Sequence, residues 1–516
     1  SSRVRLVPWM PSAVPPHMSP DRLEVVVLVV SAVLLLGVAA VRVSTGAGLP
    51  SLLLYLGIGL AIGEAGLGLR FDDAAVAQTV CTVALAVILA EGGLTTRLHV
   101  IRPVALHAGV LATLGVAISV AVTSTAAWLL LDVDVRTALL LGAVVSSTDA
   151  AAVFAVMRRL PLNRRTRALL EAESGLNDPP VIILVTLVVS SAWEDLDGWA
   201  ALFGFVQQMG LGVVAGVLVA FAGRFVLSRV ALPATGLYPL ATMTFAMLGF
   251  GVAGVVGGSP FVAVYLAGLL LGNADLPHRA ATLGFAEGLA WLSQIGLFVV
   301  LGLLASPSRL ADALVPALVV GVALTLVARP LSVALCSIPF RMPWREQAFT
   351  SWAGLRGAVP IVLATFPITA GVPNAQQIFD VTFLLVVVFT VIQGPTLPWA
   401  ASRLAVVEPE ITAELEIEHA PFEDIGASML TCDIPKGSLL HGVEISELRL
   451  PGDATVALIL RDGILFAPKP STMLRRGDHL LLAVTDSERP GVERRLRAIS
   501  RAGRLATWRG ELGLLS

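Results

Sequence analysis

Residues 169–184 read LLEAESGLNDPPVIIL and place Glu171, Glu173 and Asp178 inside an otherwise apolar run. The whole chain of 516 residues is 56% hydrophobic and only 14% charged, and its mean hydropathy is +0.84. Because soluble globular domains are about 45–50% apolar and about 25% charged, this composition indicates a polytopic membrane protein. An ionisable residue inside a membrane span is costly and is a functional residue by default.

Apolar runs follow one another from about residue 23 to residue 400, and a span needs roughly 20 residues to cross the hydrocarbon. They predict an all-α membrane unit of about thirteen spans, one of which, at 260–273, is short. The predicted bounds are 23–41, 50–68, 74–94, 103–131, 137–157, 166–191, 199–227, 236–257, 260–273, 283–305, 312–337, 347–371 and 379–399.

Residues 1–20 are Pro-rich and contain no apolar core of the kind found in secretory signals, so we expect a disordered leader, either native or introduced by cloning. An odd number of spans puts the two ends of the bundle on opposite sides of the membrane. With the N-terminus outside, fourteen arginines fall in the inward connections and three in the outward ones. Because cytoplasmic loops carry the excess of Lys and Arg, we predict a multi-pass protein of the inner (plasma) membrane with a cytoplasmic C-terminus.

The composition changes after the last span. Residues 401–424 form an acidic linker, and residues 425–500 alternate apolar and polar side chains between Gly and Pro turns. Such alternation is typical of short strands, so we predict a small cytoplasmic α+β domain at 425–500, followed by a tail at 501–516. A folded tail with no regulatory role is the alternative.

The quoted stretch carries a polar helix face. Glu173 and Asn177 are four residues apart, as are Ser174 and Asp178, so each pair lies on neighbouring turns of one helix. The two prolines that follow remove backbone donors and are expected to distort this helix. Glu171 lies nearer the Arg-rich loop and is interpreted as an interfacial charge.

A second polar segment, VVSSTDAAAVF at 144–154, contains Thr148 and Asp149. Its hydroxyl, carbonyl and carboxylate oxygens are hard ligands suited to alkali cations. About 200 residues later, SWAGLRGAVPIVLATFP at 351–367 holds Arg356 between two glycines. Interrupted, charged spans in the two halves of a chain are typical of transporters built from inverted repeats.

Simpler interpretations remain for these charges. Glu91 lies near the cytoplasmic end of its span, where a carboxylate can reach the interface. Either Asp149 or Asp178 alone would serve as a structural partner of an arginine. Arg329 and Arg356 are interpreted as counter-ions of buried carboxylates.

The segments SSTDAAAVF, ESGLNDP and SWAGLRGAVPIVLATFP resemble the NhaP-type sodium/proton exchanger superfamily of monovalent cation:proton antiporters. Within it they are most similar to the potassium/proton antiporters called cell volume regulation protein A, over residues 23–400. Residues 425–500 resemble the TrkA-C type domain found in regulators of potassium conductance. Many exchangers have proline after the aspartate of the first motif, where this chain has Ala150.

The resemblance implies two inverted six-helix repeats with broken crossing helices, a core domain that moves against a dimerisation domain, and a homodimer. The ion-site and supporting positions that it implies are Asp178, Asp149, Thr148, Ser174 and Glu91 for the ion and proton, with Glu173, Asn177, Arg329 and Arg356 in support. It also implies that Arg356 is the partner of Glu173.

A buried carboxylate that binds either a proton or a dehydrated cation couples the two fluxes by competition. We expect Asp178 to be the principal titrating group and Asp149 a second ligand. Asn177 adds no charge beside Asp178, and the only lysines are Lys436 and Lys469, outside the spans. The sequence therefore predicts electroneutral exchange of K⁺, with Na⁺ as the alternative, for H⁺ in cation, pH and volume homeostasis.

Other classes of function are less consistent with the sequence. A gated cation channel with a regulatory tail is the alternative, but no TVGYG-type filter is present. No P-loop or H-E-x-x-H motif suggests an enzyme, the three cysteines are far apart, and a net charge of −2 gives no reason to expect nucleic acid. The tail has no dinucleotide fingerprint, so we expect no resident cofactor. In the family such tails bind small regulators, cyclic di-AMP among them.

Overall fold

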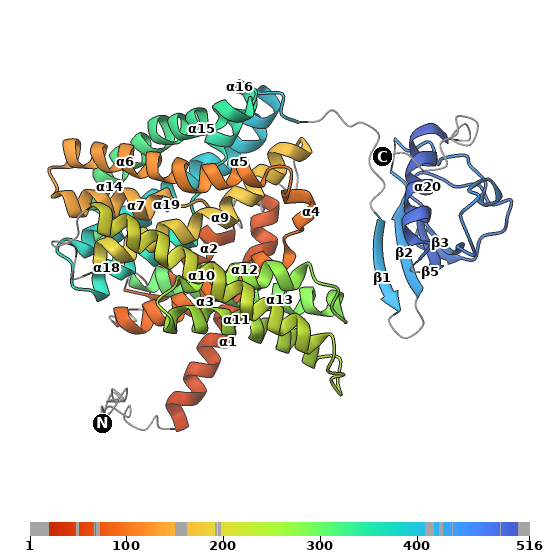
Figure 1. Ribbon diagram of the computed structural model, residues 1–516, viewed down its shortest axis with the longest axis horizontal. Coiled ribbons are helices and arrows are strands. Elements are labelled where there is room, and N and C mark those ends of the chain that lie inside the picture. The colour runs from red at the N-terminus through yellow and green to blue at the C-terminus, as the bar shows by residue number, and fades with distance from the viewer. Residues whose placement is uncertain are drawn as a thin grey trace.

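The computed structural model describes residues 20–47, 51–64, 66, 68, 73–149, 162–190, 193, 198–407, 417–422, 427–435, 437–485 and 487–503. They form a helical membrane unit and a small C-terminal unit of strands and a helix (Figure 1). The predicted leader lies outside these residues, except for Pro20, at which the first helix begins.

Thirteen apolar segments of the described chain correspond to the thirteen predicted spans, nine of them long enough to cross a bilayer and four of them shorter. The long ones are α1 (Pro20–Ala47), α3 (Ala74–Thr95), α5–η1–α6 (Ala105–Val110, Leu111–Gly115, Val116–Leu131), α9 (Arg164–Val189), α10 (Gly198–Leu227), α11 (Leu237–Val255), α13 (Arg279–Leu304), α14–η3–α15 (Pro307–Val322, Ala323–Ala328, Arg329–Ser337) and α19 (Ala375–Arg403).

The shorter segments are α2 (Ser51–Ile62), α7 (Val135–Ser146), α12 (Pro260–Gly272) and the pair α17 (Ala358–Leu363) and α18 (Thr365–Thr369). Short connecting helices are α4 (Leu98–Ile101), η4 (Ile338–Phe340) and α16 (Trp344–Trp352). Two of the predicted spans are interrupted, as the sequence indicated: α7 ends at Ser146, and 353–357 separate α16 from α17. The rest of the predicted span 137–157, from residue 150 on, lies outside the described residues.

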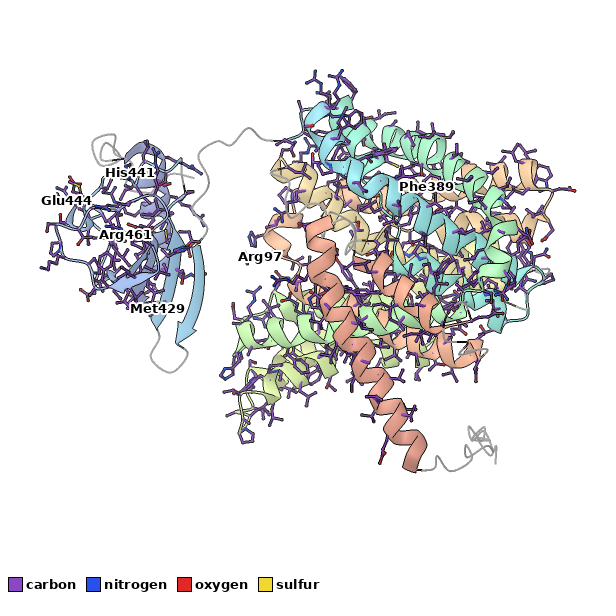
Figure 2. All side chains as sticks on the ribbon, turned by 180° about the vertical axis from the view of Figure 1, so that it is seen from behind. Arg97, Phe389, Met429, His441, Glu444 and Arg461 are labelled. Carbon is purple, nitrogen blue, oxygen red and sulfur yellow. The ribbon has the colours of Figure 1, made fainter. Side chains whose placement is uncertain are left out.

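Small residues bring the apolar helices into close contact. A Cβ on Gly268 of α12 would lie 2.6 Å from the carbonyl oxygen of Ala90 on α3, and one on Gly272 would lie 2.2 Å from that of Leu94. Likewise, a Cβ on Gly321 of α14 would overlap the ring of Phe389 on α19, which is labelled in Figure 2. Between apolar helices in lipid, such close backbone packing replaces the hydrophobic driving force that water provides elsewhere.

Two π-helical segments interrupt two long spans in a reciprocal way. The amide of Val116, at the end of η1, bonds the carbonyl of Leu111, and the amide of Arg329, at the end of η3, bonds that of Leu324. Both are the i to i+5 bonds of a π-helix. Segment η1 packs on α15 while η3 packs on α6, which is the reciprocal contact expected of two spans related by an internal two-fold axis.

Helix α1 lies at the periphery of the bundle. Only 6% of its apolar window is buried, and Figure 1 shows its N-terminal half extending past the other helices. The interior of the bundle is instead built around α7, α9 and α17, most of whose side chains are buried, together with the buried face of α3.

The C-terminal unit contains β1 (Ile417–Phe422), β2 (Ala427–Asp433), η5 (Ile445–Glu447), β3 (Thr455–Arg461), β4 (Ile464–Phe466), β5 (His479–Thr485) and α20 (Arg489–Ala502). The strands form one antiparallel sheet in the order β1-β2-β5-β3-β4. Its core includes Leu430, Leu482 and Leu496, all fully buried. The unit therefore has a hydrophobic core of its own, as the predicted α+β domain requires.

An ion pair supports this small core. Arg461 (Figure 2) donates from Nε and Nη2 to the two carboxylate oxygens of Asp478, both at 2.8 Å. These hydrogen bonds raise the pKa of Arg461 above its usual value. Asp478 is fully buried and also accepts from the amide of Arg475 at 2.7 Å, so its carboxylate is held by the arginine and by the backbone.

Candidate functional site

The two interrupted spans meet at their breaks. The amide of Asp149 donates to the carbonyl of Leu355 at 2.9 Å, and the Asp149 carboxylate accepts from the amide of Ala358 at 3.2 Å. The first bond ties the end of α7 to the segment before α17, and the second caps the start of α17. Negative charge at a helix N-terminus is favourable, so the fold stabilises Asp149 in this position.

Arg356 donates hydrogen bonds to the free carbonyl groups at the end of α7. Its Nη1 donates to the carbonyls of Ser146 at 2.9 Å and Ser147 at 2.6 Å, and its side chain is buried. The last carbonyls of a helix have no partner within the helix. A guanidinium from the second break therefore takes the place of water at the end of the first.

Glycine makes the approach of the two breaks possible. A Cβ on Gly357 would lie 1.5 Å from Oδ2 of Asp149, and one on Gly354 would lie 2.9 Å from Nε of Arg329. The first position has no room for any side chain. The positions that flank Arg356 in the sequence therefore need glycine, because charged side chains lie where a Cβ would be.

The polar face of α9 lies against this crossing. The Asn177 amide donates to Oγ1 of Thr148 at 2.5 Å, and Oγ of Ser174 lies 3.4 Å from the same atom. Asp178 is 5% exposed and interacts electrostatically with Asp149. The helix continues through both prolines, so the expected distortion does not interrupt it.

Two oxygens of this cluster stand out. Oδ1 of Asp178 and Oδ1 of Asn177 are buried and accept no hydrogen bond from any residue that the structure describes. Buried polar groups normally have a partner. Carboxylate, amide and hydroxyl oxygens together form a set of hard ligands, which fits a proton or an alkali cation rather than a transition metal.

The predicted pairing of Arg356 with Glu173 is wrong. The partner of Glu173 is Arg329, whose two terminal nitrogens reach both carboxylate oxygens, with Nη2 to Oε2 at 2.9 Å. Both side chains are buried. Arg329 follows the π-helical segment η3, and its side chain reaches Glu173 on α9, whereas Arg356 is engaged by the carbonyls at the end of α7.

Two further residues complete the description. Glu91 lies half-buried near the end of α3, and its role stays a prediction. Tyr265 of α12 was not predicted: a Cβ on Gly175 would lie 2.6 Å from its hydroxyl, which places the ring against α9. The available signal was a rare residue in a short apolar span, since the chain has only three tyrosines.

Buried carboxylates at the crossing of two broken membrane helices define a secondary transporter with an ion site inside the membrane. The family model of the sodium/hydrogen exchanger transmembrane region matches residues 29–403, and that of the TrkA-C domain matches residues 431–497. The chain belongs to the sodium/hydrogen exchanger family. It is a cation:proton antiporter, not an enzyme, and the predicted resemblance is confirmed.

Relatives match over most of their length. The K(+)/H(+) antiporter NhaP2 of Shewanella oneidensis is 38% identical over 469 residues, 89% of this chain and 79% of the relative. The K(+)/H(+) antiporter NhaP of Alkalimonas amylolytica is 36% identical over 485 residues, 92% and 83% of the two chains. The solved sodium proton antiporter MjNhaP1 of Methanocaldococcus jannaschii, 23% identical, superposes with a TM-score of 0.66 over 74% of this chain and 99% of its own, which confirms the fold.

Proposed function

We propose that this exchanger moves K⁺ in one direction and H⁺ in the other by competition at Asp178. The observation that carries the proposal is the buried pair of oxygens, Oδ1 of Asp178 and Oδ1 of Asn177, for which the described residues supply no donor. A proton or a cation would supply the missing partner, and the two cannot occupy Asp178 together. Thr148 and Ser174 would add hydroxyl oxygens, Asp149 would be the second carboxylate ligand, and Glu91 remains a further candidate.

The charges around the site favour an electroneutral cycle. Glu173 and Arg329 cancel each other in a buried pair. Asp178 interacts electrostatically with Asp149 and with Arg356, and Asn177 beside it adds no charge. One proton or one monovalent cation would neutralise the Asp178 carboxylate, so we propose an exchange of one for one.

Replacing Asp178 with Asn tests the competition directly. The amide keeps the size of the side chain but can neither release a proton nor neutralise a cation, so we expect cation-dependent proton release from proteoliposomes to be lost while the protein still folds. Asp149→Asn should give the same loss. Glu171→Gln on the same helix is the control, because Glu171 pairs with a partly exposed Arg167 and should keep exchange. Normal exchange by Asp178→Asn would reject the mechanism.

The stoichiometry has its own test. A cycle that moves a net charge shifts by about 2.3 kcal/mol per 100 mV of membrane potential, whereas a one-for-one cycle does not respond. We therefore expect equal rates in proteoliposomes clamped at positive, zero and negative potential. A cation current without proton countertransport would instead support the gated channel.

The preference for K⁺ is supported by the names of the two relatives above, which are both K(+)/H(+) antiporters. Sodium uses the same ligand chemistry, and the solved neighbour is a sodium proton antiporter. Proton release from proteoliposomes with K⁺, Na⁺ and Li⁺ at equal concentrations decides between them, and a larger response to Na⁺ would overturn the preference for K⁺.

The assembly belongs to the same proposal. We place the protein in the inner membrane with its N-terminus outside and its C-terminus in the cytoplasm, as the arginine distribution favours. A homodimer embedded in lipid agrees with the many large apolar side chains exposed on α1, α10 and α11. The C-terminal unit is proposed to regulate exchange by binding a small cytoplasmic ligand, with a nucleotide as one candidate.

A further inference from the structure

The chain that leaves the membrane unit pairs with the residues that begin α9. Leu162 and Val407 form an antiparallel bridge, and the amide of Asn163 donates to the carbonyl of Val406 at 3.2 Å. Leu162 and Val406 are 6% and 3% exposed and belong to the core of the membrane unit. These four residues, called the exit bridge below, are therefore part of the packed structure although they lie outside the helices.

A tight turn after α19 directs the chain to the exit bridge. Ala405 has a φ of 53°, in the left-handed region that alanine rarely adopts. Its amide donates to the carbonyl of Ser402, and the amide of Val406 donates to that of Ala401, both at 3.2 Å, which together form a Schellman motif. A residue other than glycine keeps this conformation only where the surrounding structure holds it. The chain therefore leaves α19 in a fixed direction and not as a loose end.

Asn163 joins three segments through three different groups. Its Oδ1 accepts from the amide of Thr166 at 2.7 Å and so caps α9. Its Nδ2 donates at 3.1 Å to Oε1 of Glu346, in the first turn of α16. Its backbone amide donates to Val406 in the exit bridge. The start of α9, the start of α16 and the chain after α19 are therefore held together at one residue.

Both helices that Asn163 joins lead to the proposed ion site. Asp178 lies 15 residues after Asn163 on the continuous helix α9, which corresponds to about 22 Å along the helix axis. Helix α16 ends at Trp352, four residues before Arg356, whose guanidinium bonds the end of α7. A displacement of the exit bridge therefore moves both of the elements that meet at the crossing.

The exit bridge is also where the membrane unit is tethered to the C-terminal unit. Nine residues separate Val407 from Ile417, where β1 begins. Because a chain spans at most about 3.3–3.6 Å per residue, the C-terminal unit stays within roughly 36 Å of the exit bridge. Along the chain, a change in the fold or position of this unit therefore reaches the exit bridge before it reaches any other part of the membrane unit.

We propose that the exit bridge is the route by which the C-terminal unit acts on the ion site, and that Asn163 is the positioning residue that passes this action to α9 and α16. The inference rests on the proposed regulatory role of the unit and adds the contact that carries it. A closed bridge holds α9 as the structure shows it. An open bridge frees the start of α9 from the chain after α19, so the unit regulates by favouring one of these two conformations.

A disulfide that keeps the exit bridge closed tests this route. Paired residues of antiparallel chains have Cα atoms about 4.5–5.5 Å apart, which is within the range of a disulfide, so Leu162→Cys/Val407→Cys should cross-link on oxidation. The three native cysteines are buried, and the two single variants are the controls. The cysteine pair is placed in the full-length chain and in the full-length chain with Asp478→Asn, which is expected to unfold the C-terminal unit because it removes a buried carboxylate.

We expect the two reduced proteins to differ in the dependence of exchange on cytoplasmic pH, and the two oxidised proteins to exchange with one common dependence. Failure of the pair to cross-link, loss of all exchange on oxidation, or a difference that persists after oxidation would each overturn the exit bridge as the route. Identical behaviour of the two reduced proteins is a separate result, because it rejects regulation by the C-terminal unit and, with it, any route for that regulation.

An exchange of side chains tests Asn163 itself. Asn163→Asp keeps an oxygen for the amide of Thr166 and keeps the backbone amide, but it sets a carboxylate against Glu346. We expect a several-fold lower maximal rate with an unchanged KM for K⁺, because the ion ligands are intact and only their support is disturbed. Asn163→Asp/Glu346→Gln again pairs a donor with an acceptor and should regain most of the rate. A wild-type rate for Asn163→Asp, or no recovery in the double variant, would overturn the positioning role.

Discussion

At the scale of the residue, Arg329 and Glu173 neutralise each other's charge in the buried interior of the bundle. Their side chains are 6% and 1% exposed. Removing one partner of a buried pair costs about 3–5 kcal/mol, because the other charge stays buried without compensation. We therefore expect Arg329→Met to lower the thermal stability of the protein in detergent strongly and to abolish exchange.

The control for this prediction is an ion pair within α9, the helix that carries Glu173. Arg167 and Glu171 are 48% and 25% exposed, and exposed pairs contribute only about 0–1 kcal/mol. Arg167→Met should therefore melt close to the wild-type temperature. If Arg329→Met also melts there, Glu173 has found another cation, and the assignment of Arg329 as its necessary partner is incorrect.

Gly357 provides a prediction about the ion site itself. An alanine Cβ there would lie 1.5 Å from Oδ2 of Asp149, so the carboxylate or the break must move. We expect Gly357→Ala to lose most exchange in proteoliposomes while remaining in the membrane. Gly296→Ala, where nothing lies within 4 Å, should behave as wild type. Full exchange by Gly357→Ala would mean that the position of Asp149 is not critical.

The sequence identified the acidic and hydroxyl side chains that meet at the crossing, because a charge inside an apolar run is visible without a structure. It did not identify which arginine faces Glu173. A π-helical turn adds one residue and shifts the register of the following helix by about 100°, and the residue pattern of the span does not indicate where such a turn occurs. The orientation of Arg329 is therefore a tertiary property.

At the scale of the element, the thirteen apolar runs predicted thirteen segments. The residues at which the short segments end could not be predicted from hydropathy. The run at 137–157 is apolar well past Ser146, where α7 ends. Hydropathy does not register that ending, because it depends on Arg356 satisfying carbonyls some 200 residues away in the chain. Local sequence thus predicts the existence of a span better than its interruption.

The contact between α3 and α12 leads to an element-level prediction. Since a Cβ on Gly268 would lie 2.6 Å from the carbonyl of Ala90, Gly268→Ile must push the two helices apart. We expect a clearly lower melting temperature in detergent and weaker exchange. Gly251→Ile on α11, where nothing lies within 4 Å, controls for the added volume, and equal melting of the two variants would show that close backbone contact does not stabilise this interface.

At the scale of the whole molecule, the two halves meet reciprocally twice, at the breaks and at the π-helical segments. At the breaks, Arg356 satisfies the end of α7 while Asp149 caps the start of α17. At the π-helical segments, each half packs its irregular turn on the regular helix of the other. A site held by both halves responds to movement of either, which is what exposure to alternate sides of the membrane requires.

The C-terminal unit yields the last prediction. Its core is formed by its own residues, from Leu430 to Ile499, so truncation near Glu418 should leave the membrane unit folded and exchange intact. A domain regulates only by binding differently to two conformations. We therefore expect the truncated protein, measured in inside-out vesicles, to change the dependence of exchange on cytoplasmic pH or on added cytoplasmic extract.

A point variant of the C-terminal unit separates the effect of unfolding this unit from the effect of removing it by truncation. Asp478→Asn removes the carboxylate that Arg461 engages through two hydrogen bonds, and so should unfold the unit in place and reproduce the truncated pH profile. If both variants match the full-length protein at every pH and with extract added, the unit serves assembly alone. In that case its removal should instead reduce the fraction of dimer in detergent.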